Sequence, residues 1–205
     1  GAGVGYGLHG WRISDLMIRH SGYPAANAAA IGISLLAGVD GATSYPYMGS
    51  SERVRILYAY TGIQDLTNGF MIHLEDCHIA SCRYGIIAGD VAGTKTTYSL
   101  HNVYVQLSVV QGMVFTNIQG LTIVGGAMDS TGQTAGTSSN PVVFSGCVGS
   151  MLGFDFEVNR IVGAAAVGIF RITNSQMVIQ GCVGYANLLD ASSASSIGVF
   201  YIESG

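Results

Sequence analysis

The segment Asp76-Cys77-His78-Ile79 has a pattern that recurs along the chain: a corner residue, an apolar residue, any residue and a second apolar residue. Arg53-Val54-Arg55-Ile56 and Asn102-Val103-Tyr104-Val105 have the same form, and their last apolar residues lie 23 positions before and 26 positions after Ile79. A small residue follows each segment three positions later. Four further segments fit the pattern, and they begin at Asp15, Gly120, Pro141 and Gln176.

A repeat of this length indicates a structural unit that cannot bury its apolar face alone and must stack on its neighbours. The apolar runs are short and alternating, Gly, Asn, Asp and Ser separate them, and helical periodicity is nearly absent. We therefore predict an all-β fold, a single solenoid domain of parallel strands over residues 1–205 with about seven to eight rungs. A β-sandwich is the alternative, and it would need tight hairpins such as one at Asn68-Gly69.

The repeat also predicts which side chains stack inside the solenoid. We expect one inward ladder to consist of Ile18, Ile56, Ile79, Val105, Ile123, Phe144 and Ile179. The neighbouring inward ladder would consist of Leu16, Val54, Cys77, Val103, Leu121, Val142 and Met177.

The composition excludes several classes of protein. Hydrophobic residues make up 49% of the chain and charged residues 10%, which excludes intrinsic disorder. The net charge of −4 and the lack of a basic run argue against nucleic acid as a partner. Polar residues interrupt every apolar stretch, so we expect no membrane insertion. The four cysteines form no CxxC pair and no zinc-finger spacing, so we predict neither a metal nor a cofactor. We interpret the sequence as a fragment of a longer chain.

The stacked apolar pattern, the corner Asp and Asn residues and the Gly-led strand starts, such as Gly112-Met113-Val114-Phe115, resemble the right-handed parallel β-helix of the pectate-lyase-like superfamily. Within that superfamily, the irregular loops and low charge are most similar to bacteriophage tailspike and polysaccharide depolymerase proteins. The resemblance covers residues 7–202. The Asn-Thr-Asp, Asp-Asp and Gly-His-Gly motifs of polygalacturonases and the Arg-x-Pro-x-x-Arg element of pectate lyases are missing, so no catalytic residue carries over by motif.

The resemblance implies a homotrimer that belongs to the virion, at the phage tail, or is extracellular. It implies that the partner is a bacterial surface polysaccharide, which such proteins bind and often cleave as glycoside hydrolases. A non-catalytic structural or adhesin β-helix is one alternative, and a polysaccharide lyase is another.

Stacking would bring outward residues of successive rungs together, and ionisable groups concentrate on the second to fourth repeats. Glu52 and Glu75 are the first predicted catalytic pair, because glycoside hydrolysis needs two carboxylates on either side of the scissile bond. His78 or His101 would orient the substrate or share the proton transfer. Arg55 would bind substrate and keep one carboxylate ionised, and Tyr104 would bind substrate.

Asp155 and Glu157 form a second candidate catalytic pair. Their spacing of two residues places both on one face of a strand, with Phe154, Phe156 and Val158 predicted to face inward. A lyase would instead use a Tyr or His base and an Arg near the uronate carboxylate. The sequence does not separate these mechanisms.

Three aromatic residues are candidates for stacking on sugar rings. Tyr45 and Tyr47 lie in the insertion at residues 38–51, which leads directly into the charged repeat, and Trp11 lies near the beginning of the chain. Flat aromatic faces match the apolar face of a pyranose while the hydroxyl or indole N–H stays in water. Loop packing or a subunit contact is the alternative role for these side chains.

Overall fold

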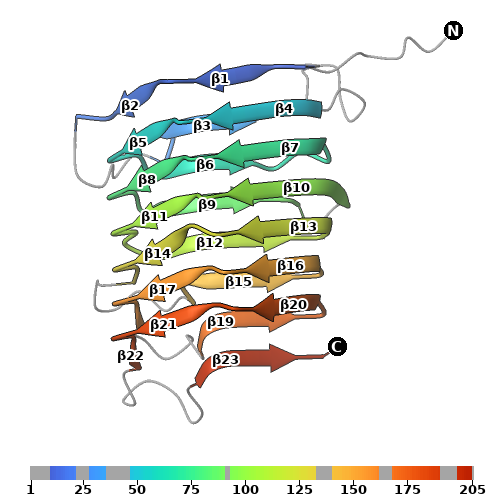
Figure 1. Cartoon of the computed structure of the whole chain (residues 1–205). Helices are drawn as coiled ribbons and strands as arrows, with labels where there is room; N and C mark the ends of the chain where they lie inside the picture. Colours follow the sequence, from blue (N-terminus) through green and yellow to red (C-terminus); the bar gives the residue numbers. More distant parts are fainter. Residues whose placement is uncertain are drawn as a thin grey trace, which may run out of the picture.

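The computed structural model describes residues 10–21, 28–35, 47–90, 93–132, 140–161, 168–189 and 198–204. Every pairing between its strands is parallel, and three seven-stranded sheets run side by side through this part of the chain. Each turn of the chain contributes one strand to each sheet, so the turns stack as rungs (Figure 1). The predicted parallel β-helix of about seven rungs is confirmed, and the sandwich is excluded because it would require antiparallel pairs.

The strands are distributed over the three sheets in strict rotation. The first sheet contains β1 (Arg12–Ser14), β4 (Tyr47–Glu52), β7 (Phe70–Glu75), β10 (Lys95–His101), β13 (Ile118–Val124), β16 (Val148–Leu152) and β20 (Gln176–Gln180). The second sheet contains β2 (Met17–Arg19), β5 (Arg55–Leu57), β8 (His78–Ala80), β11 (Tyr104–Gln106), β14 (Ala127–Asp129), β17 (Asp155–Glu157) and β21 (Val183–Tyr185). The third sheet contains β3 (Ile31–Leu35), β6 (Thr61–Asp65), β9 (Tyr84–Ala88), β12 (Gln111–Thr116), β15 (Val142–Ser145), β19 (Gly168–Thr173) and β23 (Gly198–Glu203). A short pair, β18 (Arg160–Ile161) and β22 (Leu188–Leu189), lies between the second and third sheets along the chain.

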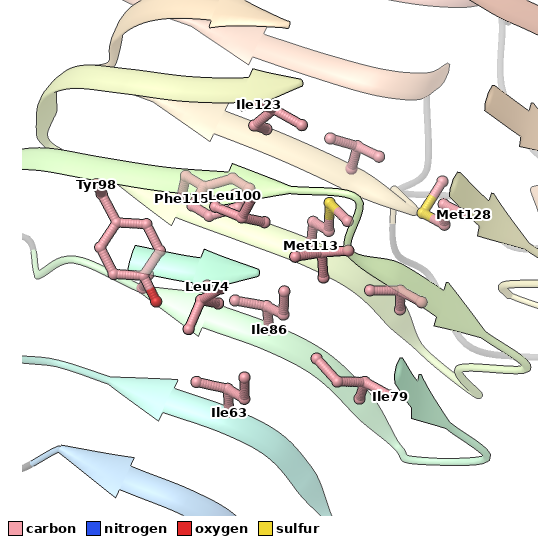
Figure 2. Packing of buried hydrophobic residues seen from close by; sticks show 14 of the residues in the cluster. Ile63, Leu74, Ile79, Ile86, Tyr98, Leu100, Met113, Phe115, Ile123 and Met128 are labelled. Carbon is pink, nitrogen blue, oxygen red and sulfur yellow. The ribbon is translucent and has the colours of Figure 1, made fainter. Parts of the chain in front are cut away.

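Apolar side chains from all three sheets fill the interior in ladders that follow the strand register. In the second sheet, Ile56, Ile79, Val105 and Met128 lie one over the next, and all four are fully buried. Figure 2 shows parallel ladders from the other sheets, with Leu74, Leu100 and Ile123 in one and Ile63, Ile86 and Met113 in another. Each rung covers the apolar side chains of the next, which is why no rung could fold alone.

The predicted ladder is correct over the first four repeats and wrong over the last three. Ile18 is the register partner of Ile56, as expected. The ladder continues from Val105 through Met128, Phe156 and Gly184, and not through the predicted residues. Ile123 and Ile179 belong to the first sheet and Phe144 to the third. The three sheets share the same alternation, so a local pattern alone does not say which sheet a strand joins.

The neighbouring ladder needs two corrections as well. Val54, Cys77 and Val103 are buried at the corner between the first and second sheets, as predicted. Leu16 lies at the same corner of the first rung and is 46% exposed, because no earlier described rung covers it. From the fifth rung onward Gly126, Phe154 and Cys182 occupy the corner, and the predicted members Leu121, Val142 and Met177 lie in the first and third sheets.

The predicted corner residue is correct in the first four repeats, and the corners of the last three rungs are Gly125, Gly153 and Gly181 instead of Gly120, Pro141 and Gln176. The backbone conformation at this corner explains the residue types found there. The residue that precedes this corner ladder has a positive φ in every rung, a left-handed conformation that Gly, Asn and Asp adopt most readily. The φ values are 54° at Asp15, 51° at Arg53, 49° at Asp76, 49° at Asn102, 59° at Gly125, 61° at Gly153 and 66° at Gly181.

Candidate functional site

The outer faces of the first two sheets carry the charged side chains that the sequence singled out. Glu52 at the end of β4 is the register partner of Glu75 at the end of β7, and Glu75 is in turn the partner of His101 in β10. Successive strands of a sheet lie about 4.8 Å apart. The two predicted carboxylates are therefore neighbours on adjacent rungs, as the stacking argument expected.

Glu52 is held by three neighbours. Arg12 in β1 forms an ion pair with Oε2 of Glu52, and the Ser50 hydroxyl donates to Oε1 at 3.0 Å. Arg53 at the corner approaches Oε2 at 3.8 Å, although its own guanidinium is engaged mainly with Asp15 at 2.6 Å. From the sequence, Arg55 was expected to keep one of these carboxylates ionised. Arg55 lies instead on the second sheet, and Arg12 makes the contact with Glu52.

Glu75 lies beside a pair of histidines. Its Oε2 is 3.4 Å from Nε2 of His73, and Nδ1 of His73 lies 2.7 Å from the Ser99 hydroxyl. The rings of His73 and His101 meet edge to face with centroids 4.8 Å apart. With 45% of its side chain exposed, against 17% for Glu52, Glu75 is the more accessible carboxylate. The residues of this group are called the Glu52–Glu75 cluster below, and they are Arg12, Ser50, Glu52, His73, Glu75, Ser99 and His101.

The sequence analysis missed Arg12, Ser50, His73 and Ser99. All four lie two positions before a column that it did consider, so strict alternation along β1, β4, β7 and β10 places them on the same outer face. The alternation of two was therefore sufficient to find them. The register of Ser14 with Glu52 likewise places Arg12 beside Ser50.

On the second sheet, Arg55, His78 and Tyr104 form a column of register partners, as predicted. The rings of His78 and Tyr104 are 5.5 Å apart in an edge-to-face contact. Burial and, next, the positive charge of Arg55 lower the pKa of His78, while Gln106 acts weakly in the opposite direction. Burial, together with the charges of Asp129, Glu157 and Asp155, raises the pKa of Tyr104. His78 is therefore better suited than Tyr104 to accept a proton near neutral pH.

Asp155 and Glu157 face outward from β17 on either side of the buried Phe156, as predicted for alternate residues of a strand. Phe154 is also buried, but Val158 is 43% exposed because its φ of 53° turns the chain at the next corner.

Glu157 has an acidic neighbour that the sequence analysis missed. Its register partner on the preceding rung is Asp129, which accepts hydrogen bonds from Gln106 at 3.0 Å and from Ser130 at 2.6 Å. Asp129 was missed because the repeat was assigned to Gly120-Leu121-Thr122-Ile123 and not to the segment that contains Met128.

Two of the three aromatic residues predicted to stack on sugar rings, Tyr47 and Trp11, lie among the described residues. Tyr45 lies outside the described residues. Tyr47, at the start of β4, stacks on Phe70 of the next rung with ring centroids 5.0 Å apart. The indole of Trp11 packs directly over the backbone at Gly49 and against the core, and its Nε1 is buried with no hydrogen-bond partner in the described part of the chain. Trp11 thus contributes to packing at the end of the solenoid.

Among the described residues there is no group of three or more His, Cys, Asp or Glu side chains that could hold a metal ion. In the same residues no helix has the length and apolar character needed to cross a bilayer. Comparison with protein-family models, curated proteins and solved structures finds no match to this chain.

Proposed function

We propose that this protein binds a bacterial surface polysaccharide along its first two sheets and cleaves it as a glycoside hydrolase, in the manner of phage tailspike depolymerases. The observation that carries the proposal is the register pairing of Glu52 with Glu75 on adjacent rungs, each with its own polar partners. Carboxyl groups about 5 to 5.5 Å apart are typical of glycosidases that retain the anomeric configuration. The rung spacing of about 4.8 Å is close to that separation.

The partners of the two carboxylates favour different roles. Glu52 is fixed by Arg12 and Ser50, which suits a carboxylate that attacks or stabilises the anomeric carbon. Glu75 is more exposed and lies against His73, whose other nitrogen contacts Ser99, which suits a group that gives a proton to the leaving oxygen. His101 packs on His73 and would hold its ring in place.

The test is turnover of polysaccharides from candidate host bacteria, measured as the release of reducing ends. Glu52→Gln and Glu75→Gln should each reduce the rate at least a hundredfold while binding persists, because a carboxamide keeps the shape but neither attacks nor donates a proton. Glu203→Gln on the third sheet is the matched control and should keep full activity. Unchanged turnover in both cluster variants would place the active site elsewhere.

A second candidate function, a polysaccharide lyase, is favoured by one observation. His78 has a lowered pKa and stands in register with Arg55, a combination suited to a neutral base beside a cation that holds a uronate carboxylate. A lyase forms unsaturated products that absorb in the ultraviolet, and His78→Asn would abolish that signal. If the wild-type protein shortens no glycan but still binds one, the protein is an adhesin.

Assembly as a homotrimer, at the phage tail or outside the cell, is part of the same proposal. Ile87, Val114 and Val143 form a half-buried apolar column on the outer side of the third sheet, and Met17, Val124 and Val178 are exposed on the first two sheets. Large exposed apolar surface favours association with another protein surface. Sedimentation equilibrium measures the state directly, and a monomer at micromolar concentration would contradict the trimer.

A further inference from the structure

The arginines of this acidic protein are concentrated at one end of the outer faces of the first and second sheets. Of its seven arginines, four lie on the first two rungs, in or between the first and second sheets, and they are Arg12, Arg19, Arg53 and Arg55. Three histidines follow on the next two rungs of these faces, and they are His73, His78 and His101. Asp15, Glu52, Glu75 and Asp76 lie among these basic groups, and Asp129, Asp155 and Glu157 follow from the fifth rung onward. In the described part of the first two sheets, arginine thus lies only on the first two rungs, and from the fifth rung onward the charged groups are carboxylates alone.

Three of the four arginines already have a partner. Arg12 pairs with Glu52, Arg53 pairs with Asp15, and the guanidinium of Arg19 lies 5.4 Å from the ring centroid of Tyr58. Arg55 is exposed and forms no ion pair with any other described residue.

The neighbours of Arg55 leave its charge uncompensated. Its partner on one side is His78, whose own protonation Arg55 disfavours, and its partner on the other side is Met17, which is 58% exposed. An anion placed over this column would find a planar guanidinium, an imidazole and the edge of Tyr104 in a row.

We infer that the polysaccharide is acidic and that a sugar carboxylate binds to Arg55, beside His78. This inference rests on the proposed glycan-binding function and specifies its substrate. Arg55 presents the fork of donors that fits a carboxylate with two hydrogen bonds. The imidazole of His78 lies beside Arg55 in register, and the ring of Tyr104 provides an apolar surface for the sugar. The Glu52–Glu75 cluster lies across the corner from this column, on the first sheet.

The experiment measures binding of a panel of uronate-containing bacterial polysaccharides, each beside its carboxyl-reduced neutral form, by isothermal titration calorimetry. The wild-type protein should bind at least one acidic form about tenfold or more tightly than its reduced form, with affinity that weakens as salt is added. Arg55→Gln should remove this preference, and Arg55→Lys should retain part of it because the charge remains without the fork. Arg171→Gln, an exposed arginine of the third sheet paired with Glu203, should leave the preference unchanged.

The outcomes separate this inference from the proposed function. Equal binding of acidic and reduced forms, or a preference that survives Arg55→Gln, overturns the acidic substrate and leaves a glycan-binding protein. Binding to no member of the panel overturns both. Thermal unfolding of each variant verifies the fold, which should be unaffected because the Arg55 side chain is exposed.

Discussion

The ammonium of Lys95 lies 2.8 Å from Oδ2 of Asp65, and both side chains are completely buried inside the solenoid. Lys95 also donates to the Gly69 carbonyl at 3.2 Å, while Oδ1 of Asp65 accepts from the Thr67 hydroxyl at 2.7 Å. Burial lowers the pKa of Lys95, and Asp65 opposes that shift. The pair joins β6 on the second rung to β10 on the fourth, and so ties rungs that are not neighbours in the stack.

Replacing only one member of this pair should strongly destabilise the fold. Lys95→Met leaves the Asp65 carboxylate buried without its cation, and we expect a loss of about 3 to 5 kcal/mol in the free energy of unfolding. The double variant Asp65→Asn, Lys95→Met should recover most of that loss, because the asparagine still accepts from Thr67 without a charge. Urea denaturation measures both variants, and additive losses in the double variant would contradict the account.

Gly85 in the third sheet should be intolerant of even one added methyl group. A Cβ at Gly85 would meet the Gly112 carbonyl oxygen, Cγ1 of Val105 at 2.5 Å and the Ser108 hydroxyl at 3.2 Å. Gly85→Ala should therefore cost about 3 kcal/mol, because a backbone oxygen cannot move aside.

Gly153→Ala is the matched control for Gly85→Ala. A Cβ there would meet nothing within 4 Å, so only its left-handed φ of 61° opposes the alanine, at a cost of about 1 kcal/mol. Equal losses in the two variants would show that close packing is not the reason for Gly85.

The buried side chain of Asn159 should contribute more to the free energy of unfolding than its hydrogen-bond partner Asn187 on the last rung. Its Oδ1 accepts from the Thr131 N–H at 3.0 Å, and its Nδ2 donates to the Met128 carbonyl at 3.1 Å. Asn159→Ala leaves both backbone groups buried and unpaired, for which we expect a loss of about 3 kcal/mol by chemical denaturation. Asn187→Ala, in the half-buried equivalent position, should cost less than half as much. The opposite order would contradict this role.

The lowered pKa of His78 predicts how stability depends on pH. Burial and Arg55 disfavour its protonation in the folded state, so between that lowered pKa and the ordinary value of about 6.5 the unfolded chain binds more protons. Stability should therefore fall as the pH is lowered through about 6.5, and it should level off below the folded-state pKa.

Variants at this column separate the contribution of His78 from that of other groups. His78→Asn should reduce the pH dependence in this window, and Arg55→Gln should reduce it in part, because one of the two causes of the shift is removed. Urea midpoints measured between pH 8 and pH 5 provide the comparison. A slope that is the same in all three proteins would assign the dependence to other groups.

The sequence alone determined the class of fold and the register of the first four rungs. Asp15, Arg53, Asp76 and Asn102 each stand at the left-handed corner before an apolar pair, and a repeat that buries one apolar column must stack its outward residues too. That is sufficient to place Glu52 beside Glu75 and Arg55 beside His78 and Tyr104.

Only the tertiary structure decided the register of the last three rungs and the partners of the carboxylates. Gly120-Leu121-Thr122-Ile123 in β13 has the same alternation as the true fifth repeat around Met128, since strands of all three sheets bury every second residue. The contact of Arg12 with Glu52 also depends on how the long insertion between β2 and β4 closes. Periodicity describes which side of a strand faces inward, and only the folded chain shows which strand lies beside it.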